Sequence, residues 1–233
     1  MRLIINLDGG VEVSYDHTYQ LYSFIVSAIR KVDQDLASKI HNNSHYPRYC
    51  MSQLLPGGKR EFGKTSMKAE RFIFLVSSLD KEILEKVKSG IEILEKVVIG
   101  KSELRLHSIT FEHVNITSEI VNMFSRSPII LKENGKYLTP NDENYKTALV
   151  NNITSKYMKV KGTVPKIRFL KIISYKSKLM SLKNAKIPAS FIKFTISSEY
   201  EFIDFIACVG VGSKTQMGYG FVEEERREVN YEF

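Results

Sequence analysis

The order of strand-like and helix-like hydrophobic patterns constrains the fold of this chain more than any other feature. In the first half, alternating apolar residues predict strands, and apolar residues at three-and-four spacing predict helices. The predicted elements are a strand at 1–7, helices at 15–31 and 33–40, strands at 49–55 and 72–77, a helix at 80–90, and strands at 97–99 and 104–116. If the two helices at 15–31 and 33–40 count as one element, and the strands at 97–99 and 104–116 as another, the order is strand, helix, strand, strand, helix, strand. This is the order of the split βαβ unit, which predicts a ferredoxin-like domain.

The second half of the chain repeats this order more loosely. The predicted elements are strands at 119–124 and 128–131, a helix at 141–157, strands at 166–175, 177–182 and 190–197, a helix at 198–207, and a last strand at 220–225. Ser198 and Glu201 have the spacing of a capping box for the last helix. We therefore expect an α+β protein of two tandem ferredoxin-like domains, residues 1–117 and residues 118–233.

The composition excludes several classes of protein. No apolar stretch approaches the roughly 18 residues that a membrane span needs, and the N-terminal apolar run is too short for a signal peptide. Cys50 and Cys208 are the only cysteines, so neither a disulfide framework nor a cysteine-rich metal site is expected. These features favour a cytoplasmic protein that does not associate with membranes.

The charge distribution points to a polyanionic partner. The formal net charge is +8, and the segment 144–198 contains twelve Lys or Arg residues but no Asp or Glu. Self-repulsion makes such a one-sign field costly unless a polyanion neutralises it. Lys166, Arg168 and Lys171 lie in the predicted strands of this segment and are candidate RNA contacts. A basic face that is simply solvated is the alternative.

A glycine-rich segment precedes the last predicted strand. Gly210 and Gly212 lie on one side of Lys214, and Gly218 and Gly220 lie on the other. Closely spaced glycines let successive N–H groups converge on an anion, and the lysine adds a full charge, so an RNA phosphate is a natural ligand. A tight structural turn is the alternative. A dinucleotide-binding loop is a third reading, but it needs strand–turn–helix order, whereas the order here is helix–loop–strand.

The segment resembles the signature loop of the CRISPR repeat-processing endoribonucleases of the RAMP superfamily. That loop has paired glycines, a stretch with Lys or Arg, and then Gly-x-Gly before an apolar residue, here Phe221. The resemblance extends over the whole chain in its two ferredoxin-like halves, its length and the position of the loop. It implies a protein that cleaves CRISPR precursor RNA within each repeat, with no cofactor. It also implies CRISPR repeat RNA as the partner, with other CRISPR-associated effector subunits or a second copy of the chain as further candidates.

The resemblance also places a catalytic histidine after the first helical region. His41 fits that position, and His45 is a second candidate. RNA can be cut without a metal when its 2′-hydroxyl attacks the adjacent phosphate. Histidine suits the acid and base roles because its pKa lies near neutrality. Arg48 would stabilise the phosphorane in place of a family lysine, and Tyr49 lies nearby. The tyrosine that some members carry in the long helix has no clear match, because Val26 is near that position and Tyr22 is one turn earlier.

Residues 58–65 match the P-loop pattern literally, which raises a nucleotidase as an alternative function. A P-loop must connect a buried strand to a helix whose N-terminus faces the phosphates, but the flanking segments here favour strands. Lys59 and Arg60 are therefore better explained as part of a basic hairpin that contacts the RNA backbone. The histidine and carboxylate spacings predict no metal site. The remaining alternative is an RNA-binding RAMP subunit of an effector complex that does not cut RNA.

Overall fold

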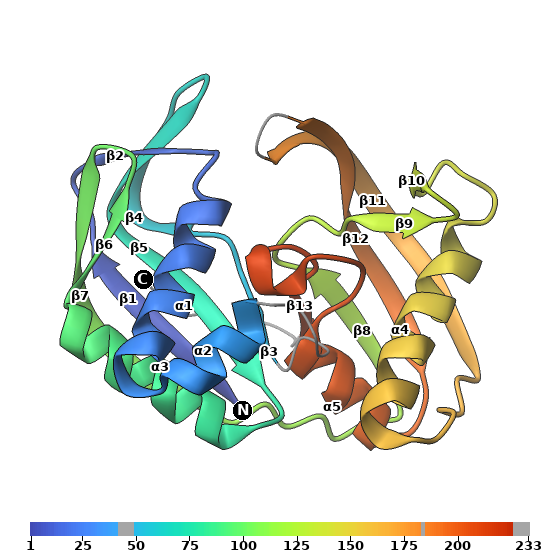
Figure 1. The fold of residues 1–233 in the computed structure, drawn as a ribbon. Helices are drawn as coiled ribbons and strands as arrows, with labels where there is room; N and C mark the ends of the chain where they lie inside the picture. The colour runs from blue at the N-terminus through green and yellow to red at the C-terminus, as the bar shows by residue number, and fades with distance from the viewer. Residues whose placement is uncertain (42–48, 183–184, 226–233) are drawn as a thin grey trace. The chain divides into compact units, whose positions relative to one another are not determined.

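The computed structural model describes residues 1–41, 49–182 and 185–225, which form two compact units. The first unit contains Met1–His113 together with Gln216–Gly218. The second unit contains Val114–Thr215 and the residues from Tyr219 to the end of the described chain. In both units, antiparallel strands form a sheet with helices on one side (Figure 1).

The first unit has ferredoxin-like topology. In its sheet, β1 lies between β5 and β7, and β3 and β4 both pair with the far edge of β5. Helix α1 connects β1 to β3 through α2, and α3 connects β5 to β7 through β6. The strands are β1 (Arg2–Asp8), β2 (Glu12–Ser14), β3 (Tyr49–Met51), β4 (Leu55–Phe62), β5 (Ser66–Ser78), β6 (Lys96–Ile99) and β7 (Ser102–Glu112), and the helices are α1 (Thr18–Val32), α2 (Gln34–His41) and α3 (Lys81–Leu94). The predicted order of elements is confirmed.

The second unit has the same topology. Its sheet has the order β11-β12-β8-β13, so that the first strand, β8, again lies between the third and the last. Its strands are β8 (Ile120–Ser125), β11 (Phe169–Leu182), β12 (Ala185–Ser197) and β13 (Val222–Glu224), its helices are α4 (Tyr145–Lys161) and α5 (Tyr200–Val209), and a separate ribbon is formed by β9 (Leu131–Glu133) and β10 (Lys136–Leu138). A 3₁₀ turn, η1 (Thr215–Met217), precedes β13. The α+β class with two tandem ferredoxin-like folds is therefore confirmed.

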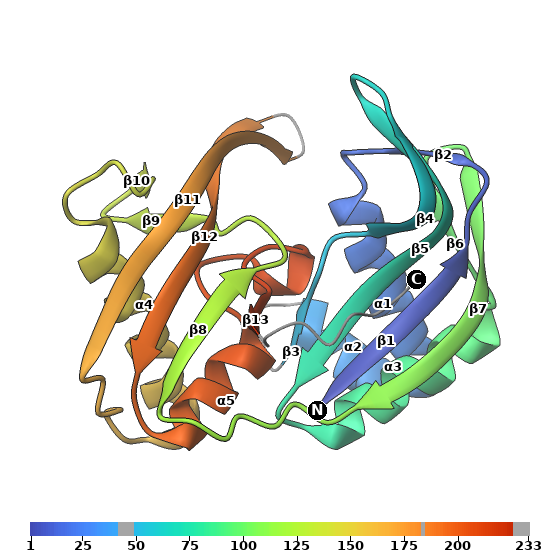
Figure 2. The same cartoon turned by 180° about the vertical axis from the view of Figure 1, so that it is seen from behind.

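Alternation along the strands directs one face of each sheet into a core. In β1, Leu3, Ile5 and Leu7 have no exposed surface, and they pack with the apolar stripe of α1. In the second unit, Phe194 and Ile196 of β12 pack in the same way beneath α4 and α5. Figure 2 shows both sheets from the side that carries no helix.

Three predictions for the second unit are wrong. The two strands predicted at 166–175 and 177–182 are one long strand, β11, whose pairing with β12 shifts register between Ile172 and Ser174. Lys176, where the sequence predicts the break, pairs with Phe191 without interruption, and the bulge lies a few residues earlier. The predicted helix at 141–157 begins only at Tyr145. Ser198 does not cap α5, because Glu199 holds that position, and the Ser198 hydroxyl instead donates to the Lys166 carbonyl at 2.9 Å.

None of the helices in the described part of the chain is both long enough and apolar enough to cross a membrane.

The close packing of α1 on α3 depends on Gly90. A β-carbon at this position would lie 1.9 Å from the Ala28 carbonyl oxygen of α1, and 2.8 Å from the Ala28 α-carbon. Both contacts involve backbone, so a side-chain rotation could not relieve them. Only a glycine allows the two helices to approach this closely.

We expect Gly90→Ala to lower the free energy of unfolding by about 2 kcal/mol or more, because overpacking outweighs the better helix propensity of alanine. Urea denaturation followed by circular dichroism measures this change. Ser89→Ala, at the exposed neighbouring position of α3, is the control and should have little effect. An equally stable Gly90→Ala variant would show that α1 and α3 tolerate a wider separation.

Candidate functional site

The candidate catalytic segment follows α2. His41 is the last residue of this helix, which agrees with the helix end predicted from the sequence. His45 and Arg48 lie outside the described residues. Tyr49 opens β3 and pairs with Ser78 at the end of β5. The segment 42–48, which contains two of the four predicted catalytic residues, is therefore bounded by two elements of the first unit.

Tyr49 is fully buried. Its side chain has 0% exposed surface, and its hydroxyl has no hydrogen-bond partner among the described residues. Burial, with a smaller contribution from the Tyr22 hydroxyl, raises the pKa of Tyr49 above its ordinary value. The phenol therefore stays protonated near neutral pH. Tyr22 belongs to α1 and is half-buried, and it is near enough to Tyr49 to contribute to this shift.

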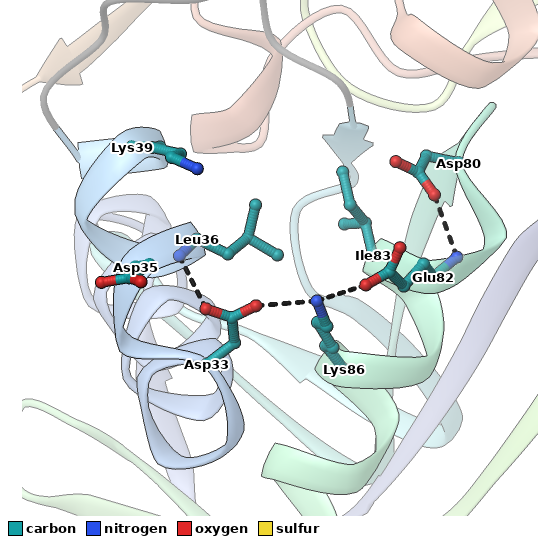
Figure 3. A pocket seen from close by; sticks show the side chains of 8 residues that line it. All are labelled: Asp33, Asp35, Leu36, Lys39, Asp80, Glu82, Ile83 and Lys86. Carbon is teal, nitrogen blue, oxygen red and sulfur yellow. Dashed lines mark hydrogen bonds and ion pairs between the residues drawn. The ribbon is translucent and has the colours of Figure 1, made fainter.

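The N-terminal end of α2 is fixed by Asp33, where α1 ends. The Leu36 N–H donates to one carboxylate oxygen of Asp33 at 2.8 Å, and Lys86 Nζ of α3 donates to the other at 2.7 Å. Lys86 also bonds to Glu82, one turn earlier on α3 (Figure 3). The Leu36 N–H, followed by Lys86, lowers the pKa of Asp33. Asp33 therefore ties α2 to both neighbouring helices.

These groups line an open pocket of about 320 Å³ between α3 and the junction of α1 with α2. Figure 3 shows Asp33, Glu82 and Lys86 joined across the pocket, and Lys39 of α2 at its rim. Lys86 bonds to the carboxylates of Asp33 and Glu82, and backbone N–H groups donate to those of Asp33 and Asp80. The pocket is therefore better explained as the space between α3 and the junction of α1 with α2, across which these hydrogen bonds run. The hydrogen bonds anchor α2, the helix that ends at His41.

His17 and His107 have structural roles. His17 is buried, its Nδ1 lies 2.8 Å from the Ser14 carbonyl, and its Nε2 accepts the Leu54 N–H at 3.1 Å. Burial lowers the pKa of His17, so the ring stays neutral and joins the start of α1 to the chain before β4. His107 lies exposed on β7, 3.2 Å from Asp8.

The glycine-rich loop is held by hydrogen bonds within the second unit. The Gly212 N–H donates to Asn152 Oδ1 at 2.8 Å, and the Gly210 carbonyl accepts from Lys156 Nζ at 3.0 Å. Asn152 and Lys156 are one turn apart on α4. The N–H groups of five loop residues donate to protein oxygens: Gly210, Val211, Gly212, Ser213 and Gly220. The predicted anion nest is therefore wrong for these five amides.

Lys214 is the exposed residue of this loop. Its backbone has φ of 60°, in the left-handed region, and its side chain is open to solvent just before η1. The glycines therefore shape the loop. Gly220 shows why, because a β-carbon there would lie 1.8 Å from the Val211 carbonyl oxygen. The sequence alone does not indicate that Asn152 and Lys156 support the loop, because this role depends on the contact of α4 with the loop in the folded structure.

The predicted RNA contacts near β11 differ in their surroundings. Arg168 is bonded to Glu119, and Lys166 Nζ lies 3.9 Å from Glu199, so both already neighbour a carboxylate. Lys171 is exposed, and it has no ion pair with another described residue. Of these three, Lys171 has the cationic group that is most available to a phosphate.

Lys59 and Arg60 are exposed in β4, which pairs with β5 as an antiparallel hairpin. The segment that matches the P-loop pattern thus runs from one strand directly into the next. No helix follows to receive a phosphate, so the geometry required by a P-loop nucleotidase is absent from this hairpin. Over 1–41, 49–182 and 185–225, no group of three or more His, Cys, Asp or Glu side chains could hold a metal ion.

We expect Lys86→Met to accelerate amide hydrogen exchange in α2, from Ala37 to Ile40, by about two- to fivefold, because the tie to Asp33 is lost. Lys88→Met is the matched control, since Lys88 pairs only with Glu92 on the same helix at 3.3 Å. Because the pKa of Asp33 is lowered, the wild-type tie is fully present above the ordinary aspartate pKa of about 3.9 and is lost only as the pH falls through the lowered pKa. Equal exchange in both variants would show that apolar packing alone holds α2.

Two family models match successive parts of the chain. The model described as "CRISPR-associated protein Cas6, N-terminal" matches residues 12–114, and the model described as "CRISPR associated protein Cas6, C-terminal" matches residues 110–224. A curated relative from Methanocaldococcus jannaschii, CRISPR-associated endoribonuclease Cas6 1, is 23% identical over 95% of this chain and 91% of its own.

Two solved structures share the fold. One, described as "An RAMP protein binding different RNA substrates", has a TM-score of 0.86 and 20% identity, and the match covers 97% of this chain and 100% of that one. The other, from the characterization of a Cas6-related gene of Pyrococcus furiosus, has a TM-score of 0.85 and 23% identity over 98% of this chain and 99% of that one. The two family models together cover residues 12–224, so the chain belongs to the Cas6 family of CRISPR-associated proteins.

Proposed function

We propose that this protein is a metal-independent endoribonuclease that cleaves CRISPR precursor RNA within each repeat. The observation that carries the proposal is His41 at the end of α2, a helix held in place by Asp33 and Lys86, in a chain whose relatives include named Cas6 endoribonucleases. Histidine suits an acid or base role because its ordinary pKa lies near neutrality.

The reaction needs an acid, a base and positive charge. The base removes the proton of a 2′-hydroxyl, whose oxygen attacks the adjacent phosphorus. The bond to the 5′-oxygen then breaks, and the acid protonates that oxygen, which leaves a cyclic phosphate and a 5′-hydroxyl. We assign one acid–base role to His41 and the second to His45, with Arg48 stabilising the phosphorane. The buried Tyr49 fits a supporting role, because it fixes the chain directly after Arg48.

The repeat RNA would be held by phosphate contacts from both units. Lys214 at the glycine loop, Lys171 on β11, and Lys59 with Arg60 on the hairpin of β4 and β5 are exposed cations that fit this role. Lys166 and Arg168 would contribute after exchanging their carboxylate partners for phosphate. Base-specific recognition would come from single-stranded positions or a small hairpin in the repeat.

The second candidate function is an RNA-binding subunit that does not cut its ligand. The favouring observation is the fold relative described as a RAMP protein that binds different RNA substrates. The two functions require the same basic surfaces and differ only in the chemistry assigned to His41 and His45. A variant that separates binding from cleavage therefore decides between them.

We expect His41→Ala to reduce the cleavage rate of a labelled repeat RNA about 10²- to 10⁴-fold in EDTA, because an acid–base group is lost. The dissociation constant should remain near that of the wild type. A repeat with a single 2′-deoxy sugar at the cut should bind but resist the wild-type protein. Tight binding of the unmodified repeat with no wild-type cleavage would favour the non-catalytic subunit.

We expect the double variant Lys59→Ser/Arg60→Ser to bind repeat RNA more weakly and with a shallower salt dependence. The slope of log affinity against log salt should fall by about 1.5, since each lost contact with a single strand removes about 0.7. The double variant Lys81→Ser/Lys88→Ser is the charge-matched control, because it removes two lysines of α3 that pair with Glu85 and Glu92. An unchanged slope in the Lys59→Ser/Arg60→Ser variant would show that the hairpin does not contact the RNA.

A further inference from the structure

The helix-free face of the second sheet combines exposed apolar side chains with lysines. Residues paired directly across antiparallel strands point to the same face. Ile120 of β8 pairs with Ser197 of β12, and Ser197 pairs with Phe169 of β11. Their neighbours Val121, Ile196 and Leu170 lie in the helix-covered core, so Ile120 and Phe169 point to the open face.

The two apolar side chains at this end of the sheet are accessible. Ile120 is 58% exposed and Phe169 is 45% exposed. The next paired row along the strands contains Asn122, Thr195 and Lys171 on the same face. Since a strand rises about 3.3 Å per residue, Lys171 follows Phe169 by about 7 Å. An aromatic ring and a cation are thus adjacent on one strand.

The charge of this face suits a polyanion. β11 contains Lys171, Lys176 and Lys178 and no acidic residue, and all three lysines are exposed. On the neighbouring strands, Glu223 and Glu225 are bonded to Arg126 and Lys193 respectively. These two carboxylates are therefore neutralised, and β11 itself contributes only positive charge to this face.

Protection of a sheet edge and binding of a protein partner would each use only part of this surface. Lysines on an edge strand such as β11 discourage pairing with another chain, but that device does not require an exposed Phe169 or Ile120. A protein interface would use the apolar residues, but lysine is depleted from such interfaces. Single-stranded RNA uses both components, because unpaired bases stack on aromatic rings while lysines contact the phosphates.

We propose that the face defined by Ile120, Phe169 and Lys171 binds a single-stranded segment of RNA, with a base stacked on the Phe169 ring and its phosphate near Lys171. The inference rests on the proposed RNA-processing function and deepens it, since it names the strandedness of the ligand and a stacking residue. A duplex, whose bases are already paired and stacked, cannot use the ring in this way.

The test compares binding of a labelled single strand of about 10 nucleotides with binding of the same strand annealed to its complement. Both strands carry 2′-O-methyl sugars, which prevents attack by the 2′-oxygen. We expect Phe169→Ala to weaken single-strand binding about 5- to 150-fold, the range of one base stack, and to leave duplex binding unchanged. Phe169→Tyr, which keeps the ring, should restore binding, and Lys171→Ala should reduce the salt slope by about 0.7.

Tyr200→Ala is the matched control, because Tyr200 is an aromatic residue of α5 with 48% exposure. If Phe169→Ala and Tyr200→Ala bind the single strand equally well, the proposed surface is wrong. A wild-type dimer in light scattering that Phe169→Ala dissociates, with unchanged single-strand binding, would identify a protein interface instead.

A cleavage assay run in parallel separates this inference from the proposed function. Failure of the wild type to cut repeat RNA, with single-strand binding that still depends on Phe169, would overturn the endoribonuclease and retain the surface. Normal cleavage that requires His41, with single-strand binding indifferent to Phe169, would overturn the surface alone.

Discussion

In both units the sheet buries only one face, and the candidate functional surfaces depend on which side chains this arrangement leaves outside. Leu3, Ile5 and Leu7 of β1 contact helices in the first unit, as Phe194 and Ile196 of β12 do in the second. A sheet with helices on both sides would have no open face and would present mainly its edges and strand ends to a polymer. The one-sided arrangement leaves an open face, an edge strand and the ends of the helices available to RNA.

The end of α2 and the glycine loop are candidate functional segments that share one feature: side chains from elsewhere in the fold fix their position. Asp33 and Lys86 secure α2 before it reaches His41. Asn152 and Lys156 of α4 secure the glycine loop before it presents Lys214. In both cases the supporting residues come from helices that pack on the sheet, so precision at the segment derives from the packed core. This is the arrangement expected where acid–base geometry or phosphate contacts must be maintained on a loop.

The cationic residues divide into those already paired within the fold and those available to a ligand. Arg168, Lys166 and Lys193 have carboxylate neighbours, whereas Lys171 and Lys214 are exposed. A segment rich in lysine can fold without severe self-repulsion because acidic residues from outside the segment, such as Glu119 and Glu225, form ion pairs with it in the folded structure. The exposed lysines of β11 lie beside apolar side chains, and this combination is the basis for proposing an RNA-binding surface there.

The order of the elements, the paired ferredoxin-like folds and the end of α2 at His41 could all be predicted from the chain, because hydrophobic periodicity and local stop signals suffice for these. The partners of the glycine-loop amides, the burial of Tyr49 and the cap of α5 emerged only with the folded structure. Each depends on a residue distant in sequence. Asn152 accepts a hydrogen bond from the Gly212 N–H, and the Lys166 carbonyl accepts one from the Ser198 hydroxyl. Strand β5 pairs with β3 at Tyr49. The local sequence determines where a hydrogen-bond donor or an aromatic ring occurs. Tertiary packing determines which residue accepts the hydrogen bond or buries the ring.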